Sequence, residues 1–369
     1  MSQYGAYGAA KAGLSWRQIL RFYYPGTSHV QQKEGTTIKV WISADRDDDL
    51  RVLPAAGLRL RDGGGHTYLL PSGADRTAWR ITRSGTGFAL AHRTAAGYWA
   101  KQATGLDSST WWFSDTAHVI KVWLPGGSRR ELRGRVGLVK RGTGGRTVNR
   151  VSMEDYLRGV VPAEMPTSWL ADAVRVQAVA ARSFAARLQA SARAGTGYDL
   201  CDTANCQVYR GLAATSGSRR TVFETTRGDA AVRTTERTVL SYGGTIALTL
   251  FGSSNGGSSA KGSYRYLVAQ PDPYERLVTD TSWTRKISAA SVARLWPAAG
   301  TVGQLKVTRR DGSGRWGGRA ISVTVVGSRR NVVVSGSTFA WRFGLRSRLF
   351  TFGDGGQPTM VAGVALRAS

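Results

Sequence analysis

The chain has 369 residues, of which 41% are hydrophobic, and its formal net charge of +27 arises from 51 basic residues against 24 acidic ones. This length can bury a sizeable core in two or three domains. No apolar run approaches the roughly 20 residues of a membrane-spanning helix. The charge leads us to expect a polyanionic partner, such as nucleic acid, anionic lipid or an acidic cell-wall polymer. A solvated basic surface without such a partner is the alternative.

The first 147 residues predict one short helix followed by a β-rich module. In segment 1–36, "SWRQILRFYY" has the pattern of an amphipathic helix that ends at "PGT". From 37 to 147, short runs such as "TIKVWIS" and "HVIKVWL" alternate with Gly, Asp and Ser turns. Runs of this kind, bounded by turn residues, predict a small all-β module.

Segment 148–354 predicts a mixed domain, so we expect the α+β fold class for the chain, with a long helix packed on mixed or antiparallel strands. Its first helix is predicted at "SMEDYLRGVV". A longer one is predicted from a Thr167 or Ser168 cap to Gly195. Beyond about residue 250, Gly/Ser loops carry short strands, and 355–369 is predicted to be a flexible tail.

The long helix has one apolar stripe that we expect to be buried. Its members recur at the three- and four-residue spacings of one helix face: Leu170, Val174, Gln177, Ala178, Ala181, Ala185 and Leu188. Gln177 is the polar exception. The small alanines predict a close approach by another element.

Glu164 is a lone carboxylate just before this helix. Pro162 and Pro166 predict an extended segment around it, since residues before proline avoid the α region. Its apolar neighbours would desolvate the carboxyl and raise its pKa, which suits a general acid. In the alternative interpretation, Glu164 caps the helix N-terminus, which would lower its pKa.

The two cysteines, Cys201 and Cys206, lie close together in "YDLCDTANCQVYRG". A single short C-x4-C pair indicates either a disulfide formed in an oxidising compartment or half of a metal site.

Several motifs resemble, in order, those of the SpoIID/LytB family, the sporulation stage II protein D type of peptidoglycan lytic transglycosylase. They are "NRVSMEDYLRGVVPAEMPTSWLADAVRVQAVAARSFA", "YDLCDTANCQVYRG", "FGSSNGG", "QPDPY" and "AWRFGLRSRLF", between about 130 and 352. The opening "MSQYGAYGAAKAG" resembles a family segment that usually follows a "GHGxG" lead. We therefore expect an upstream in-frame extension that encodes this lead and a signal peptide or anchor.

The resemblance implies that Glu164 is the single catalytic acid/base. A glycoside hydrolase usually needs two carboxylates, whereas a lytic transglycosylase needs one, because a hydroxyl of the substrate attacks the anomeric carbon to give a 1,6-anhydro product. Glu154 is the alternative second carboxylate, although a solvated helix face or helix-start charge also explains it. The alternative function is a non-catalytic wall-binding module or an activator of a separate amidase.

The resemblance also implies a set of residues that line the glycan cleft, each with a core or turn role as the alternative: Gln177, Arg182, Tyr209, Ser253, Ser254 and Asn255. Some relatives bind zinc at a "CDTxHC" motif, but here Asn205 replaces the histidine, and the four histidines lie in the N-terminal third. We therefore expect no metal, no cofactor and a disulfide between Cys201 and Cys206.

The expected partners are peptidoglycan glycan strands and anionic cell-wall polymers, with an amidase added if the protein is an activator. Only the net charge supports nucleic acid as a partner. The sequence has no motif for specific recognition of nucleic acid, so we expect no specific nucleic-acid partner. The expected location is extracellular or associated with the cell wall.

Overall fold

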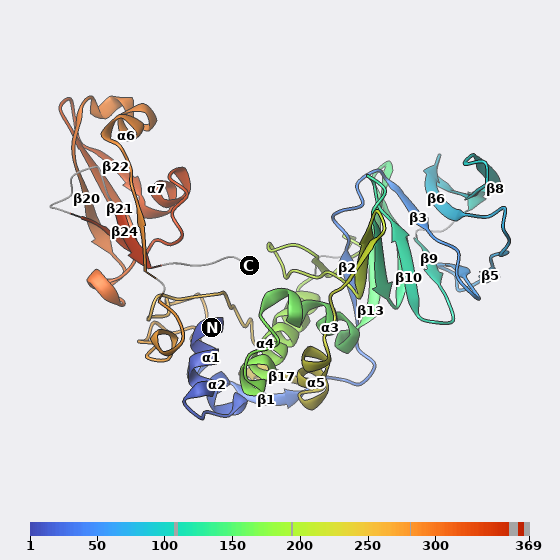
Figure 1. Cartoon of the computed structure of the whole chain (residues 1–369), viewed down its shortest axis with the longest axis horizontal. Helices are drawn as coiled ribbons and strands as arrows, with labels where there is room; N and C mark the ends of the chain where they lie inside the picture. Colours follow the sequence, from blue (N-terminus) through green and yellow to red (C-terminus); the bar gives the residue numbers. More distant parts are fainter. Residues whose placement is uncertain (107–109, 193–194, 281, 354–360, 365–369) are drawn as a thin grey trace. The chain divides into compact units, whose positions relative to one another are not determined.

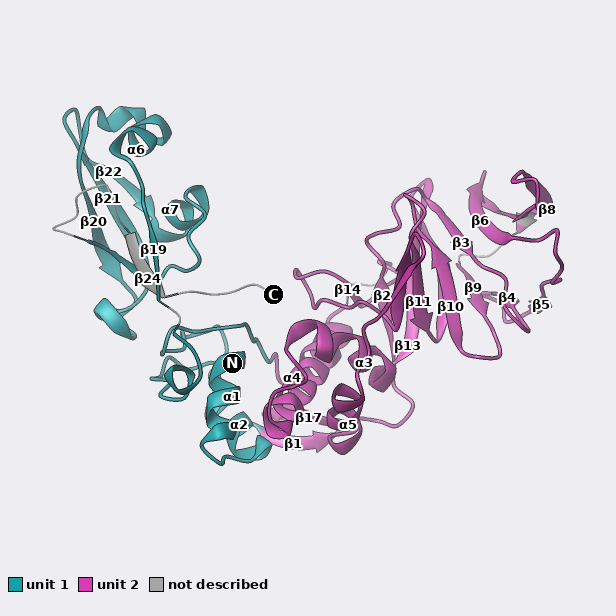
Figure 2. Cartoon of the chain, viewed as in Figure 1, with its two compact units in different colours: residues 1–27, 249–369 teal, residues 28–248 magenta. Residues whose placement is uncertain are grey.

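A computed structural model describes residues 1–106, 110–192, 195–280, 282–353 and 361–364. None of the helices in these ranges has the length and apolar character needed to cross a membrane. The chain divides into two compact units (Figure 2), which are residues 1–27 with 249–369 and residues 28–248. We refer to them as unit 1 and unit 2.

The two units follow different boundaries from the four segments expected from the sequence. The strands of 37–147 share unit 2 with the long helix, and the opening 27 residues share unit 1 with the C-terminal part of the chain. Unit 1 therefore combines two segments that are far apart in the sequence. Local composition along the chain gives no sign that they belong together.

Unit 2 contains three sheets. The eight-stranded sheet has the order β16-β15-β11-β10-β3-β6-β7-β8, the seven-stranded sheet β14-β2-β13-β12-β9-β4-β5, and the smallest β1-β17-β18. The strands of the first are Asp49–Val52 (β3), Ala78–Ser84 (β6), Gly87–Arg93 (β7), Trp99–Leu106 (β8), Val119–Trp123 (β10), Arg129–Arg133 (β11), Ala213–Ser216 (β15) and Arg219–Val222 (β16). The strands of the seven-stranded sheet are Thr37–Trp41 (β2), Arg59–Asp62 (β4), Thr67–Leu69 (β5), Thr110–Ser114 (β9), Arg135–Arg141 (β12), Gly144–Ser152 (β13) and Leu200–Cys201 (β14). The strands of the smallest sheet are Ser28–Gln31 (β1), Thr238–Tyr242 (β17) and Thr245–Ile246 (β18).

The β-rich module has the alternating burial of strands with one face toward a core. In β10, Ile120 and Val122 are buried while Lys121 between them is exposed. Neighbouring strands such as β6 and β7 pair in antiparallel register. The strands expected from "TIKVWIS" and "HVIKVWL" are present, as β2 and β10.

Three helices of unit 2 carry the motifs singled out in the sequence: Met153–Glu164 (α3), Ala171–Ala190 (α4) and Thr226–Thr234 (α5). Figure 1 shows α4 beside α3 and α5, and α4 also contacts β17. The helix α3 begins where the Ser152 hydroxyl accepts a hydrogen bond from the Asp155 N–H, an N-cap. The expected α+β class, with a long helix packed against strands, is confirmed.

The start, the end and one stripe residue of the long helix differ from the prediction. Its N-cap is Leu170, without a side-chain cap, and its C-cap is Ser191. The Thr167 hydroxyl instead accepts a hydrogen bond from that of Thr225. Leu170 is exposed, whereas Val174, Gln177, Ala178, Ala181 and Ala185 are buried and Leu188 is half-buried.

Pro162 lies inside α3 and not in an extended segment, so that part of the prediction was wrong. A proline in a helix interior lacks one backbone hydrogen bond and is costly. The neighbouring Val160 and Val161 are fully buried, and this packing offsets the cost. The helix therefore continues past Pro162 to Glu164.

Unit 1 combines short helices with two three-stranded sheets, β19-β24-β23 and β20-β21-β22. Its helices are Gln3–Lys11 (α1), Trp16–Tyr23 (α2), Ala289–Leu295 (α6) and Gly336–Arg342 (α7), with 3-10 turns Glu275–Leu277 (η1), Pro297–Ala299 (η2) and Arg315–Gly317 (η3). Its strands are Ser282–Arg285 (β19), Val302–Arg310 (β20), Ala320–Gly327 (β21), Val332–Ser335 (β22), Phe350–Phe352 (β23) and Val361–Val364 (β24).

Two elements of unit 1 differ from expectation. The helix α1 was missed because its alanines and glycines form no clear apolar stripe. In the segment expected to be a flexible tail, residues 361–364 form β24, which pairs with β19 and β23. The rest of 355–369 lies outside the described residues.

Candidate active site

Glu164 is the last residue of α3, and its side chain is half-buried. It does not cap the long helix, whose N-cap is Leu170. Backbone carbonyls at a helix C-terminus carry partial negative charge, which disfavours a second negative charge nearby. This position therefore favours the protonated carboxyl, in contrast to the capping interpretation.

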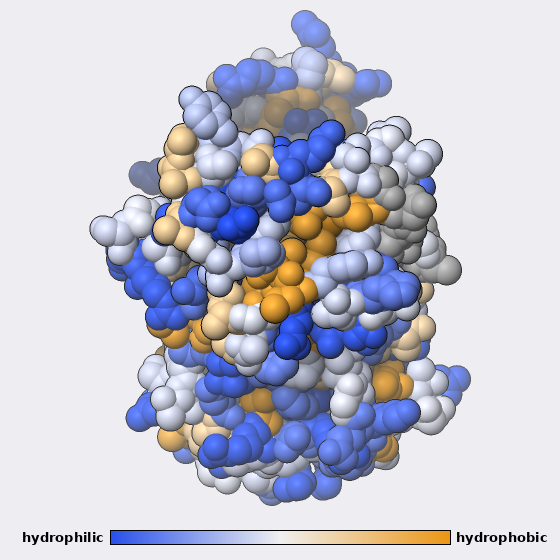
Figure 3. All heavy atoms as spheres, turned by 90° about the vertical axis from the view of Figure 1, so that its right-hand side faces the viewer, coloured by the Kyte–Doolittle hydropathy of each residue, from blue (hydrophilic) through white to orange (hydrophobic). Residues whose placement is uncertain are grey.

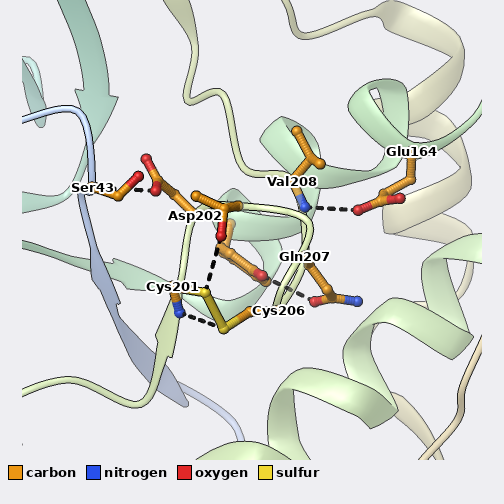
Figure 4. Close-up of a disulfide and its surroundings, with 9 residues drawn as sticks. Ser43, Glu164, Cys201, Asp202, Cys206, Gln207 and Val208 are labelled. Carbon is orange, nitrogen blue, oxygen red and sulfur yellow. Dashed lines mark hydrogen bonds between the residues drawn. A yellow bond between two sulfur atoms is a disulfide. The ribbon is translucent and has the colours of Figure 1, made fainter. Parts of the chain in front are cut away.

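The carboxyl of Glu164 is held by a backbone group from a distant segment. Its Oε1 accepts a hydrogen bond of 2.7 Å from the Val208 N–H (Figure 4). Burial raises the pKa of Glu164 above its ordinary value, and this effect exceeds the opposing effects of the Val208 N–H and the Arg210 charge. Glu164 thus combines a fixed orientation with an increased tendency to hold a proton.

The segment 200–210 is fixed at both ends, which positions the Val208 N–H. At its start, β14 pairs in parallel with β2, and the Asp202 carboxylate accepts from the Ser43 N–H at 3.1 Å. Arg130 forms an ion pair of 2.6 Å with Asp202 and donates to the backbone carbonyls of Tyr209 and Arg210. These contacts join the segment to the sheets.

The middle of the segment is joined to the helices. Gln207 is buried, accepts from the Tyr156 hydroxyl of α3 at 2.9 Å and donates to the Ala181 carbonyl of α4 at 3.3 Å. Cys201 and Cys206 form a disulfide that closes the turn (Figure 4). Gln207 therefore holds the residue before Val208 against α3 and α4, and the disulfide constrains the turn that precedes it.

Three residues expected to line a glycan cleft are in the core of unit 2. Gln177 and Arg182 are 0% exposed, and Tyr209 is 1% exposed. The Tyr209 hydroxyl donates to Asn149 at 2.8 Å, and its ring lies against Gly159, where an added Cβ would be 2.7 Å from the Tyr209 Cε2. Burial favours a role for these residues in positioning α3, α4 and segment 200–210 over direct contact with a glycan.

Arg182 has a specific structural partner. Its Nε and Nη2 donate to the two carboxylate oxygens of Glu154 at 3.0 and 2.6 Å, and its remaining bonds go to the Thr238 and Val232 carbonyls. Glu154 also accepts from the Arg237 N–H. Glu154 is therefore a charge at the start of α3, as one of the two interpretations has it, and through Arg182 it joins α3 to α4.

Ser253, Ser254 and Asn255 belong to unit 1. Asn255 donates from its side chain to Asp272 at 2.7 Å and from its backbone to Glu275 at 3.1 Å. Ser254 is buried, and Ser253 accepts from the Tyr4 N–H through its carbonyl. This loop borders a cavity of about 480 Å³ whose lining includes Gly256, Gly257, Asp272 and Glu275.

Another cavity lies beside the residues that follow Glu164 in the chain. Its volume is about 320 Å³, and residues 167–171, the first turns of α4 and one face of α5 line it. Trp169 and Leu170 supply apolar surface, and Arg175 and Arg227 supply positive charge. An apolar wall next to guanidinium groups is suited to a sugar ring with an anionic substituent.

The surface of the β-rich module is largely hydrophilic. Figure 3 looks from the side where β5, β6 and β8 lie in Figure 1, and it shows mostly hydrophilic residues with a band of apolar ones across the middle. Among the exposed large apolar side chains of this unit are Tyr68, Leu69 and Tyr98. The surface thus offers both charge and apolar contacts.

Sequence reasoning missed the groups that hold Glu164. Val208 acts through its backbone N–H, for which no side-chain signal exists. Arg210, Gln207 and Asp202 all lie in or next to the quoted "CDTANCQVYRG" stretch, so the unusual concentration of polar residues around the cysteines was the available signal.

Comparisons with known proteins identify the middle of the chain. Residues 141–242, which include Glu164 and both cysteines, match the family model SpoIID, described as Stage II sporulation protein. The amidase enhancer of Bacillus subtilis is 33% identical over 138 residues, 36% of this chain and 17% of that protein. Stage II sporulation protein D of the same organism is 30% identical over 159 residues, 40% of this chain and 46% of that protein. Stage II sporulation protein D of Bacillus amyloliquefaciens is 26% identical over 226 residues, which are 56% of this chain and 62% of that protein. The chain thus spans less than two thirds of each relative.

Proposed function

The chain belongs to the SpoIID/LytB family, and on this premise we propose that it is a lytic transglycosylase that cleaves the bond between MurNAc and GlcNAc in peptidoglycan. The observation that supports this proposal is the half-buried carboxyl of Glu164, which has a raised pKa and a fixed orientation. The match to the SpoIID family and the names of the relatives support a role related to the cell wall more generally.

In the proposed reaction, Glu164 donates its proton to the glycosidic oxygen as the bond from the MurNAc C1 to that oxygen breaks. The C6 hydroxyl of the same MurNAc attacks C1, and Glu164 takes up the hydroxyl proton. The products are a GlcNAc hydroxyl end and a 1,6-anhydro MurNAc end, without consumption of water. Because Oε1 accepts from Val208, the transferable proton belongs on Oε2.

The surroundings of Glu164 suit a mechanism with a single carboxylate. Burial raises its pKa, and the groups that oppose this effect are the Val208 N–H and the cation Arg210. A hydrolase of the retaining type would instead hold a second carboxyl group about 5 Å away. The cavity bordered by Trp169, Arg175 and Arg227 is our candidate for binding the adjacent part of the glycan.

The test is Glu164→Gln, which keeps the side-chain shape and removes the transferable proton. We expect release of 1,6-anhydro muropeptides from purified sacculi to fall by about 10²- to 10⁴-fold, measured by mass spectrometry. Glu236→Gln, the same change at an exposed carboxylate of unit 2, is the control and should keep wild-type turnover. Near wild-type cleavage by Glu164→Gln, or wild-type products with reducing MurNAc ends, would contradict the proposal.

One comparison favours a second candidate function, since a relative is named amidase enhancer. In this alternative the chain binds the wall and stimulates a separate amidase without cleaving glycan. It predicts no anhydro products from the wild-type protein, and equal stimulation of an added amidase by the wild type and by Glu164→Gln.

We also propose that the protein acts outside the cytoplasm, in contact with the wall. A disulfide persists in oxidising compartments, and the Cys201–Cys206 disulfide supports this location. Recovery of the native protein in the cytosolic fraction with both thiols reduced would contradict it.

A further inference from the structure

Three aspartates converge where the loop after β2 leads into the first residue of β3. One carboxylate oxygen from each of Asp45, Asp47 and Asp49 lies within 4.8 Å of the other two. Asp45 is buried, Asp47 is exposed and Asp49 is half-buried, so the cluster extends from the interior to solvent. The spacing of two residues lets one short segment present all three carboxylates.

Asp45 shows that the protein groups leave part of this cluster unsatisfied. It is 6% exposed, and its Oδ2 accepts from the Thr147 hydroxyl at 2.7 Å. Its Oδ1 is buried and accepts no hydrogen bond from any described residue. A buried carboxylate oxygen without a partner is costly, which calls for a ligand that the chain itself does not supply.

The neighbouring arginines compensate the cluster only in part. Arg51 binds one oxygen of Asp47 and one of Asp49, and Arg80 acts on Asp49 from a greater distance. Two guanidinium groups therefore face three carboxylates. Burial raises the pKa of Asp45 to about 6, and burial together with the Asp45 charge raises that of Asp49 to about 6.

We propose that Asp45, Asp47 and Asp49 bind a hard divalent cation, with calcium preferred over magnesium. Carboxylate oxygens are the ligands of both ions, but calcium accepts irregular sets of six to eight oxygens, whereas magnesium requires a near-octahedral set. Three carboxylates from one turn, completed by water, match the calcium preference. The positive charge of Arg51, which pairs with Asp47 and Asp49, limits the affinity.

The experiment titrates the purified chain, first treated with EDTA, with CaCl₂ in a calorimeter and follows its melting temperature. We expect one calcium per chain with a Kd on the order of 10⁻⁴ to 10⁻³ M, the range of extracellular calcium modules. The melting temperature should rise by several degrees in millimolar CaCl₂ and less in MgCl₂. NaCl at matched ionic strength controls for screening of surface charge.

Two variants test the ligands. Asp47 is exposed, so Asp47→Asn should fold and should weaken calcium binding by about tenfold or more, since the number of ligand charges sets affinity. Asp48→Asn is the matched control, because Asp48 lies in the same turn, outside the cluster, and bonds the Gly145 N–H through an oxygen that asparagine retains. The proposal is wrong if calcium produces neither heat nor a melting shift, or if both variants weaken binding equally.

Discussion

Glu164 shows how one carboxyl group can be made a proton donor without a second acid beside it. Burial raises its pKa, while the Val208 N–H and the Arg210 charge act in the opposite direction by favouring the ionised form. In the proposed reaction this group donates a proton in one step and accepts one in the next. The last turn of α3 fixes its backbone, and segment 200–210 fixes its side chain.

The raised pKa predicts how stability depends on pH. A carboxyl whose pKa is higher in the folded state binds its proton more tightly there than in the unfolded chain, so its contribution to stability is lost as pH rises from the ordinary carboxyl value, about 4.3, through the folded value. Glu164→Gln, which cannot ionise, avoids this loss. We expect its melting temperature to exceed that of the wild type at pH 7.5 and to equal it near pH 4.

Scanning calorimetry of both proteins at the two pH values checks this prediction. A wild type that is more stable than Glu164→Gln at pH 7.5 would mean that Val208 and Arg210 outweigh burial, so that the folded pKa lies below the ordinary value.

The packing of α3 on α4 depends on the Glu154–Arg182 pair. Arg182 is 0% exposed and lies in the middle of an alanine-rich helix whose small side chains allow close contact. Its guanidinium group binds Glu154 in the first turn of α3, the Val232 carbonyl of α5 and the Thr238 carbonyl of β17. One buried side chain therefore joins the helices to the small sheet.

Loss of this pair should destabilise unit 2 strongly. Glu154→Gln leaves the buried Arg182 charge without a counter-ion, and we expect the free energy of unfolding to fall by about 3 kcal/mol, measured by urea denaturation. Asp75→Asn removes an exposed partner of Arg76 and should change stability by less than about 0.5 kcal/mol. If Glu154→Gln is as stable as the wild type but as inactive as Glu164→Gln, Glu154 acts in catalysis and the structural role is wrong.

The net charge of +27 belongs to the molecule as a whole. Arginines paired with carboxylates, such as Arg130 with Asp202 and Arg133 with Glu224, add nothing to this net value, so the excess positive charge is available to an anionic polymer. Charge of this kind acts over long distances and without geometric precision, so it supports retention on a polymer more than selection of one bond.

Sacculus binding should therefore depend on salt. Exposed charges are screened beyond a Debye length of about 8 Å at physiological ionic strength and about 3 Å at 1 M. We expect the fraction of protein that sediments with sacculi to fall steeply between these conditions. Tight binding that is unchanged at 1 M NaCl would assign retention to glycan contacts and not to charge.

Local patterns in the chain were sufficient for the fold class, the two central helices and the position of Glu164 before the long helix. Periodicity, caps and turn residues act over a few residues, so they are readable along the sequence. They also indicated that the long helix carries buried small side chains, such as Ala178, Ala181 and Ala185. The resemblance to a family then identified which carboxylate to examine.

The environment of each site residue was decided only by tertiary structure. Val208 is 44 residues from Glu164, and Glu154 is 28 residues from Arg182. Burial of Val160 and Val161 overrides the breaking tendency of Pro162, and Arg182 is in the core because Glu154 meets it there. Whether a polar side chain faces a substrate or a buried partner depends on contacts between distant segments, and these contacts leave no periodic signal in the sequence.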